Sequence, residues 1–154
     1  MERRLTEEQV TKAILDWLEA NGWEIICFDF PQSGTGVSLH PNEELRTTKN
    51  EGAFIPDIVA IKNGSVVFFE NKDRFVLADF IKVEELKKNN DFSNSIERLL
   101  NDFEYSNIFY GVGLAHSDNT ENKTNDNLDK IDFALFISEY RSVSVYYQIN
   151  SIFP

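Results

Sequence analysis

Two carboxylates and a lysine flank a two-residue turn near the middle of the chain. Asp57 precedes the apolar run IVAI, and Glu70 and Lys72 follow the apolar run VVFF. Asn63-Gly64 separates the two runs, and both residues tolerate the positive φ angles of a type I′ turn. The pattern predicts a β-hairpin that carries all three charged side chains.

The predicted hairpin, residues 54–74, brings these side chains to one face of a sheet. A two-residue turn places Asp57 directly opposite Glu70, where Cβ atoms lie about 4.5–5.5 Å apart. Lys72 projects to the same side because it lies two residues beyond Glu70. A slip of one residue would instead move Glu70 and Lys72 to the other face.

The three side chains have compatible chemical roles. Facing carboxylates in apolar surroundings are destabilising unless their charge is compensated. Mg²⁺ compensates it well, because this ion binds one or two carboxylates together with waters and phosphate oxygens. Lys72 would then orient the attacking water or stabilise negative charge on the phosphate. The arrangement indicates metal-dependent phosphodiester hydrolysis; the alternative is a simple ion pair in which Lys72 bridges Asp57 and Glu70.

Helices and strands are expected to alternate around this hairpin. Thr6 and Gln9 form a capping-box pattern, and apolar residues at helical spacing predict a helix over residues 6–20. The other expected helices lie at 76–89 and 94–104, and the expected strands at 23–30, 54–62, 65–71, 107–115, 131–138 and 142–149. This succession predicts one α/β domain over residues 1–154, since neither a linker nor a repeat divides the chain.

Two long polar stretches are expected to be loops. The first covers about 31–52, and the second, 116–130, is expected to be mobile because it is almost entirely polar. Gly34-Thr35-Gly36 in the first stretch suggests a phosphate cradle, but no helix follows it, and a plain loop is favoured.

The net charge of −11 argues against a protein that coats nucleic acid. Residues 43–88 nevertheless hold eight of the 15 basic side chains, against nine acidic ones. This stretch forms either a locally positive groove or an ordinary mixed surface. Arg74 and Lys82 are the candidate phosphate contacts. The alternative for Arg74 is a surface ion pair, and the alternative for Lys82 is a place on a solvated helix face.

The cysteine and histidine content and the apolar segments bear on the cellular location and on zinc binding. Cys27 is the only cysteine, so the chain has no internal disulfide, and a reducing cytoplasm is expected. Neither a secretory signal nor an apolar run of membrane-spanning length is present. His40 and His116 stand alone in polar stretches, so no zinc site is expected.

Pro56-Asp57, twelve further residues and then Glu70-Asn71-Lys72 resemble the signature of the PD-(D/E)xK nuclease superfamily, which includes restriction endonucleases and Holliday-junction resolvases. The resemblance implies a restriction-endonuclease-like αβββαβ core, with a mixed sheet flanked by helices. That core would cover about residues 6–115, and the C-terminal β-hairpin at 131–149 would be an addition to it.

The resemblance also implies roles for single residues. Asp57 and Glu70 would bind Mg²⁺ or Mn²⁺, and Lys72 would be the catalytic lysine. Many members have a supporting glutamate on the first helix, which is Glu7 or Glu8 here, with Glu8 preferred. Acids in a first helical turn also favour the helix dipole without any catalytic role.

The leading interpretation is therefore a Mg²⁺-dependent endonuclease that hydrolyses DNA phosphodiester bonds. A short chain of 154 residues would cut both strands as a homodimer, by analogy with the family. The alternatives are a catalytically inactive nuclease-like subunit that binds a protein partner, and an interaction domain in which the three side chains form only a salt bridge.

Overall fold

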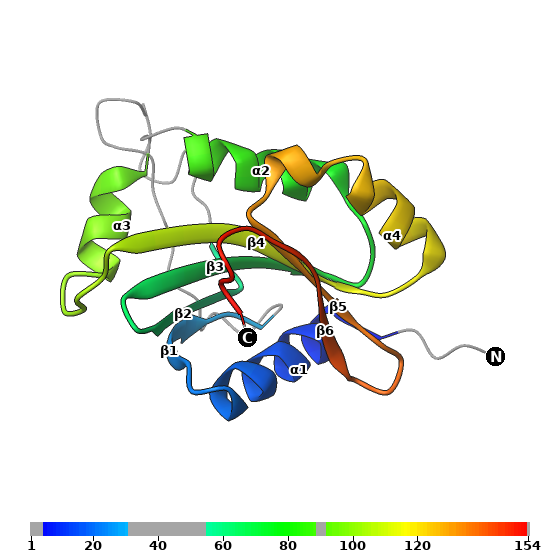
Figure 1. The fold of residues 1–154 in the computed structure, drawn as a ribbon, viewed down its shortest axis with the longest axis horizontal. Helices are drawn as coiled ribbons and strands as arrows, with labels where there is room; N and C mark the ends of the chain where they lie inside the picture. Colours follow the sequence, from blue (N-terminus) through cyan, green and yellow to red (C-terminus); the bar gives the residue numbers. More distant parts are fainter. Residues whose placement is uncertain (1–4, 31–54, 89–91, 154) are drawn as a thin grey trace.

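A six-stranded mixed sheet forms the centre of the molecule (Figure 1). The computed structural model describes residues 5–30, 55–88 and 92–153. The strands are β1 (Glu24–Phe28), β2 (Ile58–Lys62), β3 (Ser65–Lys72), β4 (Asn107–Ala115), β5 (Phe133–Ile137) and β6 (Val143–Gln148). They lie in chain order: β1, β2 and β3 are antiparallel, β3, β4 and β5 are parallel, and β6 returns antiparallel to β5. The α/β class and the mixed sheet are as predicted.

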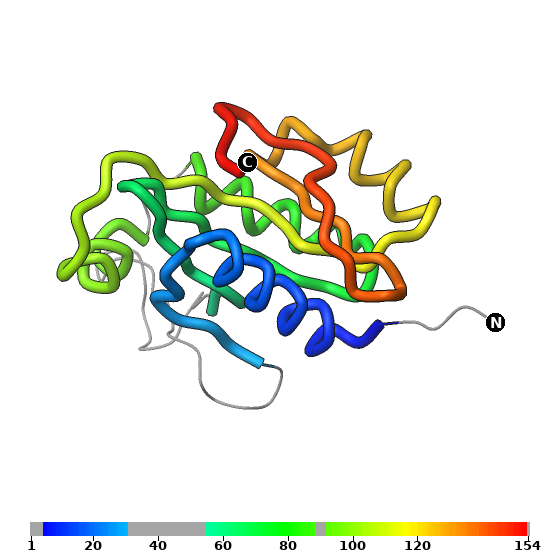
Figure 2. Tube along the Cα trace, turned by 60° about the horizontal axis from the view of Figure 1, so that its bottom comes forward, coloured from blue at the N-terminus to red at the C-terminus, as the bar shows by residue number. Residues whose placement is uncertain are grey.

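Helices cover both faces of this sheet. The helices are α1 (Glu7–Ala20), α2 (Leu77–Lys88), α3 (Ser93–Leu99), α4 (Asp118–Asn125) and the short 3₁₀ helix η2 (Leu128–Lys130). Figures 1 and 2 show α1 on one side of the sheet and α2 on the other. In the part of the chain that the structure describes, no helix is long and apolar enough to cross a membrane.

Alternation along the strands divides the apolar side chains into two cores. Under α1 the strands contribute residues such as Ala60, Val67 and Phe69. Under α2 and α3 the strands contribute the residues next to these in sequence, such as Val59 and Phe68. Because successive strand residues point to opposite faces, both faces of β2 and β3 are apolar, as expected of strands that helices cover on both sides.

The start of α1 is fixed by its cap. The Thr6 hydroxyl accepts a hydrogen bond from the Gln9 amide at 3.1 Å, and the Thr6 amide donates to the Gln9 side chain at 2.9 Å, which confirms the predicted capping box. The chain leaves the helix at Gly22, whose φ is +84°. Glu7 is therefore the first residue of α1.

The predicted hairpin is confirmed, together with its register from Ile58 to Phe69. Asn63 and Gly64 have φ angles of 49° and 81°, as a type I′ turn requires. Ile58 pairs with Phe69, and the pairing continues without a slip to Lys62 opposite Ser65. The strand β2 begins at Ile58, later than expected, so Asp57 lies just before it.

The prediction of a mobile loop over 116–130 was wrong, because α4 and η2 lie there. The Ser117 hydroxyl caps α4 by accepting from the Thr120 amide at 3.1 Å. Thr120 is buried and accepts a hydrogen bond from the Phe75 amide at 3.3 Å. Capping and two buried threonines, Thr120 and Thr124, fix a helix that has almost no apolar residues and so lacks a periodic signal.

Other boundaries also differ from expectation. The helix predicted over 94–104 ends at Leu99 and continues as a turn, so α3 is shorter. Segment 31–52, with Gly34-Thr35-Gly36 and His40, lies outside the described residues.

Gly113 on β4 lies where α1 packs closely on the sheet. A Cβ atom there would overlap the Ile14 side chain of α1 and lie 2.7 Å from Oδ1 of Asn71 on β3. We expect Gly113→Ala to lower the free energy of unfolding by about 1–3 kcal/mol, because the strand and helix must move apart. Denaturant unfolding measures this loss, and an unchanged midpoint would contradict the close approach.

Candidate active site

Glu70 and Lys72 lie at the end of β3, and Asp57 lies just before β2, the neighbouring strand. Strand alternation places Glu70 and Lys72 on the face of Phe68, which belongs to the core beneath α2. The Asp57 amide donates to the Phe69 carbonyl oxygen at 2.9 Å, so Asp57 is joined to β3 just outside the regular ladder. The charge of Asp57 raises the pKa of Glu70 and the charge of Lys72 lowers it, so the three groups act on one another electrostatically.

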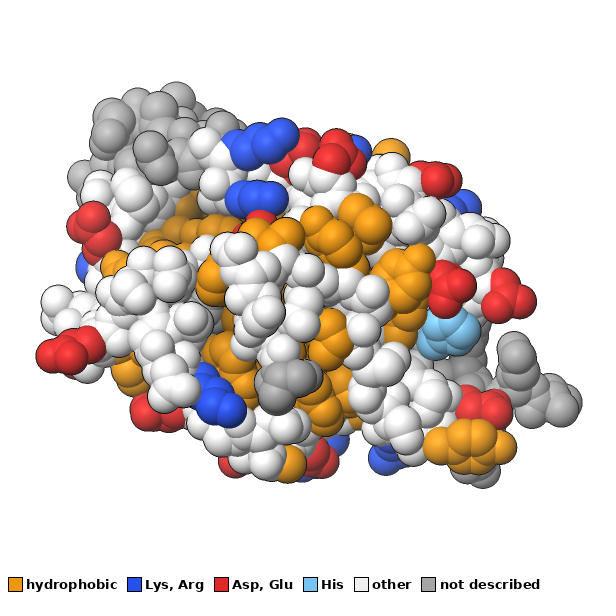
Figure 3. Space-filling view, in the orientation of Figure 1, with side chains coloured by type: hydrophobic (Ala, Val, Ile, Leu, Met, Phe, Trp, Pro, Cys, Tyr) orange, Lys and Arg blue, Asp and Glu red, His pale blue; other side chains and the backbone are white. Residues whose placement is uncertain are grey.

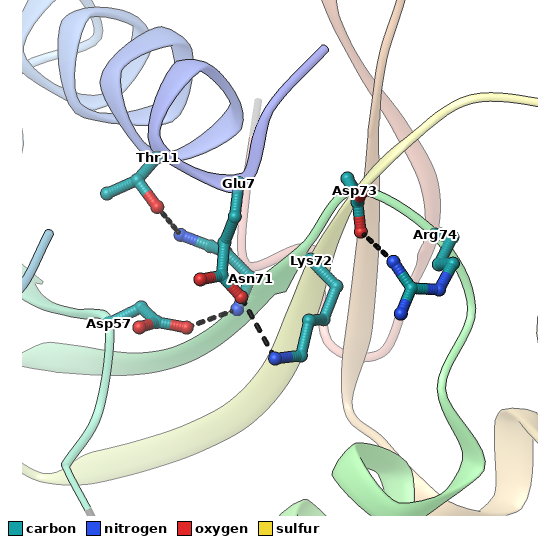
Figure 4. Close-up of polar contacts among 7 residues, drawn as sticks. All are labelled: Glu7, Thr11, Asp57, Asn71, Lys72, Asp73 and Arg74. Atoms are coloured by element: carbon teal, nitrogen blue, oxygen red, sulfur yellow. Dashed lines mark hydrogen bonds and ion pairs between the residues drawn. The ribbon is translucent and has the colours of Figure 1, made fainter. Parts of the chain in front are cut away.

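Asp57 is held by the backbone of the opposite strand. Its Oδ2 atom accepts a hydrogen bond from the Asn71 amide at 2.6 Å (Figure 4). Burial, with smaller contributions from the charges of Glu7 and Asp29, outweighs the opposing hydrogen bond and raises the pKa of Asp57 to about 7. The carboxylate is thus oriented by one oxygen while its ionised form is disfavoured.

Glu70 is the most perturbed acid of the site. Its side chain is 9% exposed, and its Oε2 atom has no hydrogen-bond partner among the described residues. Burial, together with the charges of Asp57 and Asp79, raises the pKa of Glu70 to about 9. A buried carboxylate without a partner is costly, so Glu70 requires either a proton or a cation.

Lys72 contacts a glutamate of the first helix, but not the one that was preferred. Its Nζ lies 3.0 Å from Oε1 of Glu7, and Figure 4 shows the two side chains pointing toward each other. Glu8 is exposed on α1. Consecutive helical residues point in directions about 100° apart, so the orientation of α1 on the sheet selects Glu7. The hydrogen bond that the Lys72 ammonium donates to Glu7 raises the pKa of Lys72.

Asn71 connects the strand that carries the site to α1. Its side chain is fully buried on the face opposite Glu70 and donates to the Thr11 hydroxyl at 3.2 Å (Figure 4). Thr11 lies one turn after Glu7 on the same helix. Through its backbone Asn71 orients Asp57, and through its side chain it holds α1 where Glu7 reaches Lys72.

Removing the Thr11 hydroxyl should destabilise the protein. Thr11→Val keeps the shape but leaves the buried Asn71 amide group without an acceptor, so we expect a loss of about 1–3 kcal/mol in the free energy of unfolding. Thr124→Val is the matched control: Thr124 is equally buried, but its hydroxyl has no partner among the described residues. That control should be neutral or stabilising in the same denaturant titration; equal losses in both variants would argue against the Asn71 contact.

Sequence reasoning missed two further acids near the site. The Asp29 amide donates to the Asp57 carbonyl oxygen at 2.9 Å. Asp79 on α2 is 5% exposed, and burial raises its pKa. Asp79 did leave a signal in the sequence, because it lies on the apolar stripe of α2 beside Phe80 and Val83.

The candidate phosphate contacts differ in their surroundings. Arg74 pairs with Asp73 at 2.8 Å, and Figure 4 shows this pair turned away from Lys72. Lys82 is exposed and forms no ion pair within 5–30, 55–88 and 92–153, and its charge lowers the pKa of Glu70. Three other basic residues of the 43–88 stretch are engaged elsewhere: Lys62 donates to the Asn21 carbonyl, Lys87 pairs with Asp132, and Lys88 pairs with Glu84. A continuous positive groove is not apparent in this part.

Asp57 and Glu70 are the residues of the site that could hold a divalent cation. Within the described ranges, no three His, Cys, Asp or Glu side chains converge as a ready-made metal cage. Mg²⁺ needs only one or two carboxylates, since waters and substrate phosphates supply its other ligands. Asp57 and Glu70 provide that pair, and the unpartnered Glu70 oxygen fits such an ion.

His116, which was expected to stand alone in a polar stretch, lies with its Nε2 atom 3.2 Å from Oε1 of Glu121.

Comparisons of the chain with protein-family models, with curated proteins and with solved structures found no match.

Proposed function

We propose that this chain is a Mg²⁺- or Mn²⁺-dependent endonuclease that hydrolyses DNA phosphodiester bonds, with the catalytic set of the PD-(D/E)xK superfamily. The observation that carries the proposal is the buried Glu70 carboxylate, which has an unpartnered oxygen, is acted on by the charge of Asp57 and shares its strand with Lys72. A salt bridge alone would not explain this arrangement, because Lys72 pairs with Glu7 rather than with Asp57 or Glu70.

Asp57 and Glu70 would hold the metal ion. When bound, the ion supplies positive charge at the phosphate and a water of lowered pKa. The Asn71 amide keeps the Asp57 carboxylate oriented, so little rearrangement of that ligand is required on binding. Binding would also ionise Glu70, whose pKa is raised to about 9 in the absence of a cation.

Lys72 would act as a cation rather than as a base. Its hydrogen bond to Glu7 raises its pKa, so the ammonium stays protonated at neutral pH. An ammonium fixed beside the metal ligands can donate to a phosphate oxygen on which negative charge develops. Glu7 thus acts through Lys72 as a positioning residue, in the place where Glu8 was expected.

The order of elements supports the proposal. A helix precedes the three antiparallel strands β1, β2 and β3, and helices then lead to β4, which lies parallel to β3. This succession is compatible with the restriction-endonuclease-like αβββαβ core. In this interpretation β5 and β6 extend the core sheet at one edge.

The test is cleavage by the purified chain in Mg²⁺, in Mn²⁺ and in EDTA. The substrates should include supercoiled plasmid, branched DNA, single-stranded DNA and RNA, because DNA is proposed and its form is not. We expect strand breaks in DNA with either metal and none in EDTA. If the wild type binds Mn²⁺ yet cleaves none of these substrates, the endonuclease proposal fails.

A second candidate is a nuclease-like subunit that binds a protein partner or a second copy of the chain. The strand β6 lies at an edge of the sheet, and partly exposed apolar residues occur there and beyond it, such as Val145, Tyr147 and Ile152. Figure 3 shows hydrophobic side chains reaching the surface across the middle of this view, with charged ones around them. Edge strands can pair with another chain. Sedimentation of the chain alone and with DNA distinguishes a homodimer from a monomer.

A further inference from the structure

The turn between β5 and β6 displays an aromatic and a basic side chain that the proposed mechanism leaves unused. Tyr140 is 84% exposed, whereas Leu77, the next most exposed large apolar side chain among the described residues, is 47% exposed. In the same part of the chain, the Arg141 guanidinium forms no ion pair. Both side chains are therefore available to a ligand.

Hydrogen bonds within the turn fix the backbone that carries these two side chains. The Ser138 hydroxyl accepts from the Tyr140 amide at 3.3 Å and from the Ser142 amide at 3.1 Å. The Arg141 amide donates to the Ser138 carbonyl oxygen at 2.8 Å. Arg141 has a φ of +66°, in the left-handed region where such hairpin turns favour glycine. An arginine at this position costs stability that a glycine would not, as residues at binding sites often do.

The turn lies at the same end of the sheet as Lys72. Because β3, β4 and β5 are parallel, their carboxyl ends share one edge: Lys72 pairs with Leu114, and Leu114 pairs with Phe136 near the end of β5. Neighbouring strands lie about 4.8 Å apart, so β5 is about 10 Å from β3. Figures 1 and 2 show the turn near the start of α1, the helix from which Glu7 reaches Lys72. A nucleic-acid strand bound at the candidate active site is thus within a few nucleotides of the turn.

A hollow of about 500 Å³ opens beside the turn, between α1 and the start of β6. It is lined by Trp17 and by the ion pair of Lys12 and Asp16 on α1, and by Arg141 and Val143 from the hairpin. Its volume lies in the range of pockets that hold small organic groups. Aromatic rings and arginine are the side chains on which unstacked bases of single strands are held.

We propose that this turn and the hollow beside it bind an unpaired strand of the DNA substrate, so that the protein cleaves DNA that contains a single-stranded segment. The inference rests on the proposed function, in which DNA is the substrate. Tyr140 stacks on an unpaired base, whose face duplex DNA does not offer along its length, and Arg141 donates to a phosphate oxygen. Glu139 is exposed in the same turn and repels phosphate, so stacking supplies more of the affinity than charge does.

The test is binding of a labelled single-stranded DNA oligonucleotide, and of the duplex of the same sequence, to the full chain in EDTA, measured by fluorescence anisotropy. We expect tighter binding of the single strand, and a weakening of about 5- to 100-fold in Tyr140→Ala. Tyr140→Phe keeps the ring and should bind as the wild type does. Arg141→Gln should reduce the salt dependence of binding. Tyr105→Ala is the matched control, because Tyr105 is also exposed but lies just before β4, at the opposite end of the parallel strands.

Quenching of tryptophan fluorescence gives a second reading, because Trp17 lines the hollow and Trp23 is only 4% exposed. Equal affinity for single strand and duplex, or unchanged affinity in Tyr140→Ala, overturns the inference and leaves metal-dependent cleavage intact. A loss specific to Tyr140→Ala supports the inference even if no substrate is cleaved, so the two proposals fail separately. Tighter binding of RNA of the same sequence overturns the assignment to DNA. Should Tyr140→Ala not fold, a wild type whose Trp17 fluorescence the oligonucleotide leaves unchanged overturns the inference.

Discussion

Replacing Asp57 with asparagine is expected to lower the rate of metal-dependent DNA cleavage by about 100- to 1,000-fold while leaving the protein folded. The substitution keeps an oxygen that can accept the hydrogen bond from the Asn71 amide, which lies 2.6 Å from Oδ2. It removes the negative charge that the metal ion requires, and the loss of one electrostatic group of this kind typically costs that factor. Single-turnover cleavage at saturating Mn²⁺ measures it.

Lys72→Met should give a similar loss of rate for a different reason. Methionine preserves much of the side-chain length but removes the ammonium that Glu7 holds at 3.0 Å. Binding of the metal should therefore persist in Lys72→Met and weaken in Asp57→Asn. The Asp102→Asn variant, altered at an exposed position, should cleave at the wild-type rate. Wild-type cleavage by either site variant would remove the assigned residue from the mechanism.

The second expectation is that Glu70→Gln stabilises the metal-free protein. Burial of the Glu70 carboxylate raises its pKa from 4.5 to about 9. Between these values the unfolded chain carries an ionised Glu70 while the folded protein carries the neutral acid, so rising pH favours unfolding. Glutamine removes this difference, and we expect a gain of about 1–3 kcal/mol in the free energy of unfolding at pH 8.

The pH dependence gives a sharper form of the same test. In EDTA, the stability of the wild type should fall as the pH rises from about 4.5 to about 9, and Glu70→Gln should flatten that slope. Asp57, whose pKa burial raises from 3.8 to about 7, contributes a similar loss at lower pH in both proteins. Glu97→Gln is the matched control at an exposed position.

Added Mg²⁺ should reverse the order of the two proteins. A ligand that binds only the folded state stabilises that state by mass action, so the wild type should gain stability and Glu70→Gln should gain little. A metal-free Glu70→Gln that is less stable than the wild type at pH 8 would mean that the Glu70 carboxylate is satisfied in the fold, contrary to its unpartnered Oε2 atom.

Short-range chemistry determined the elements that the sequence predicted well. The Asn63-Gly64 turn sets the register of the hairpin by itself, because its positive φ angles permit one two-residue connection. The capping box likewise determines where α1 begins. The positions of Glu70 and Lys72 on one face of β3 follow from strand alternation, whereas facing positions for Asp57 and Glu70 stay a prediction. The turn and the cap each depend on residues within a few positions of one another, and the register depends on the hydrogen bonds between two neighbouring strands.

The tertiary structure decided everything that depends on how distant segments pack. Glu7 rather than Glu8 meets Lys72 because Asn71 and Thr11 fix how α1 lies on β3. The helix α4 forms because its N-terminus is capped and its buried polar side chains contact the rest of the fold. Its sequence has no apolar periodicity from which the helix could have been predicted. Asp79 reaches the region of Glu70 only when α2 folds back over the sheet. Such contacts join different helices and strands, and the sequence pattern within one element does not specify how that element is oriented against another.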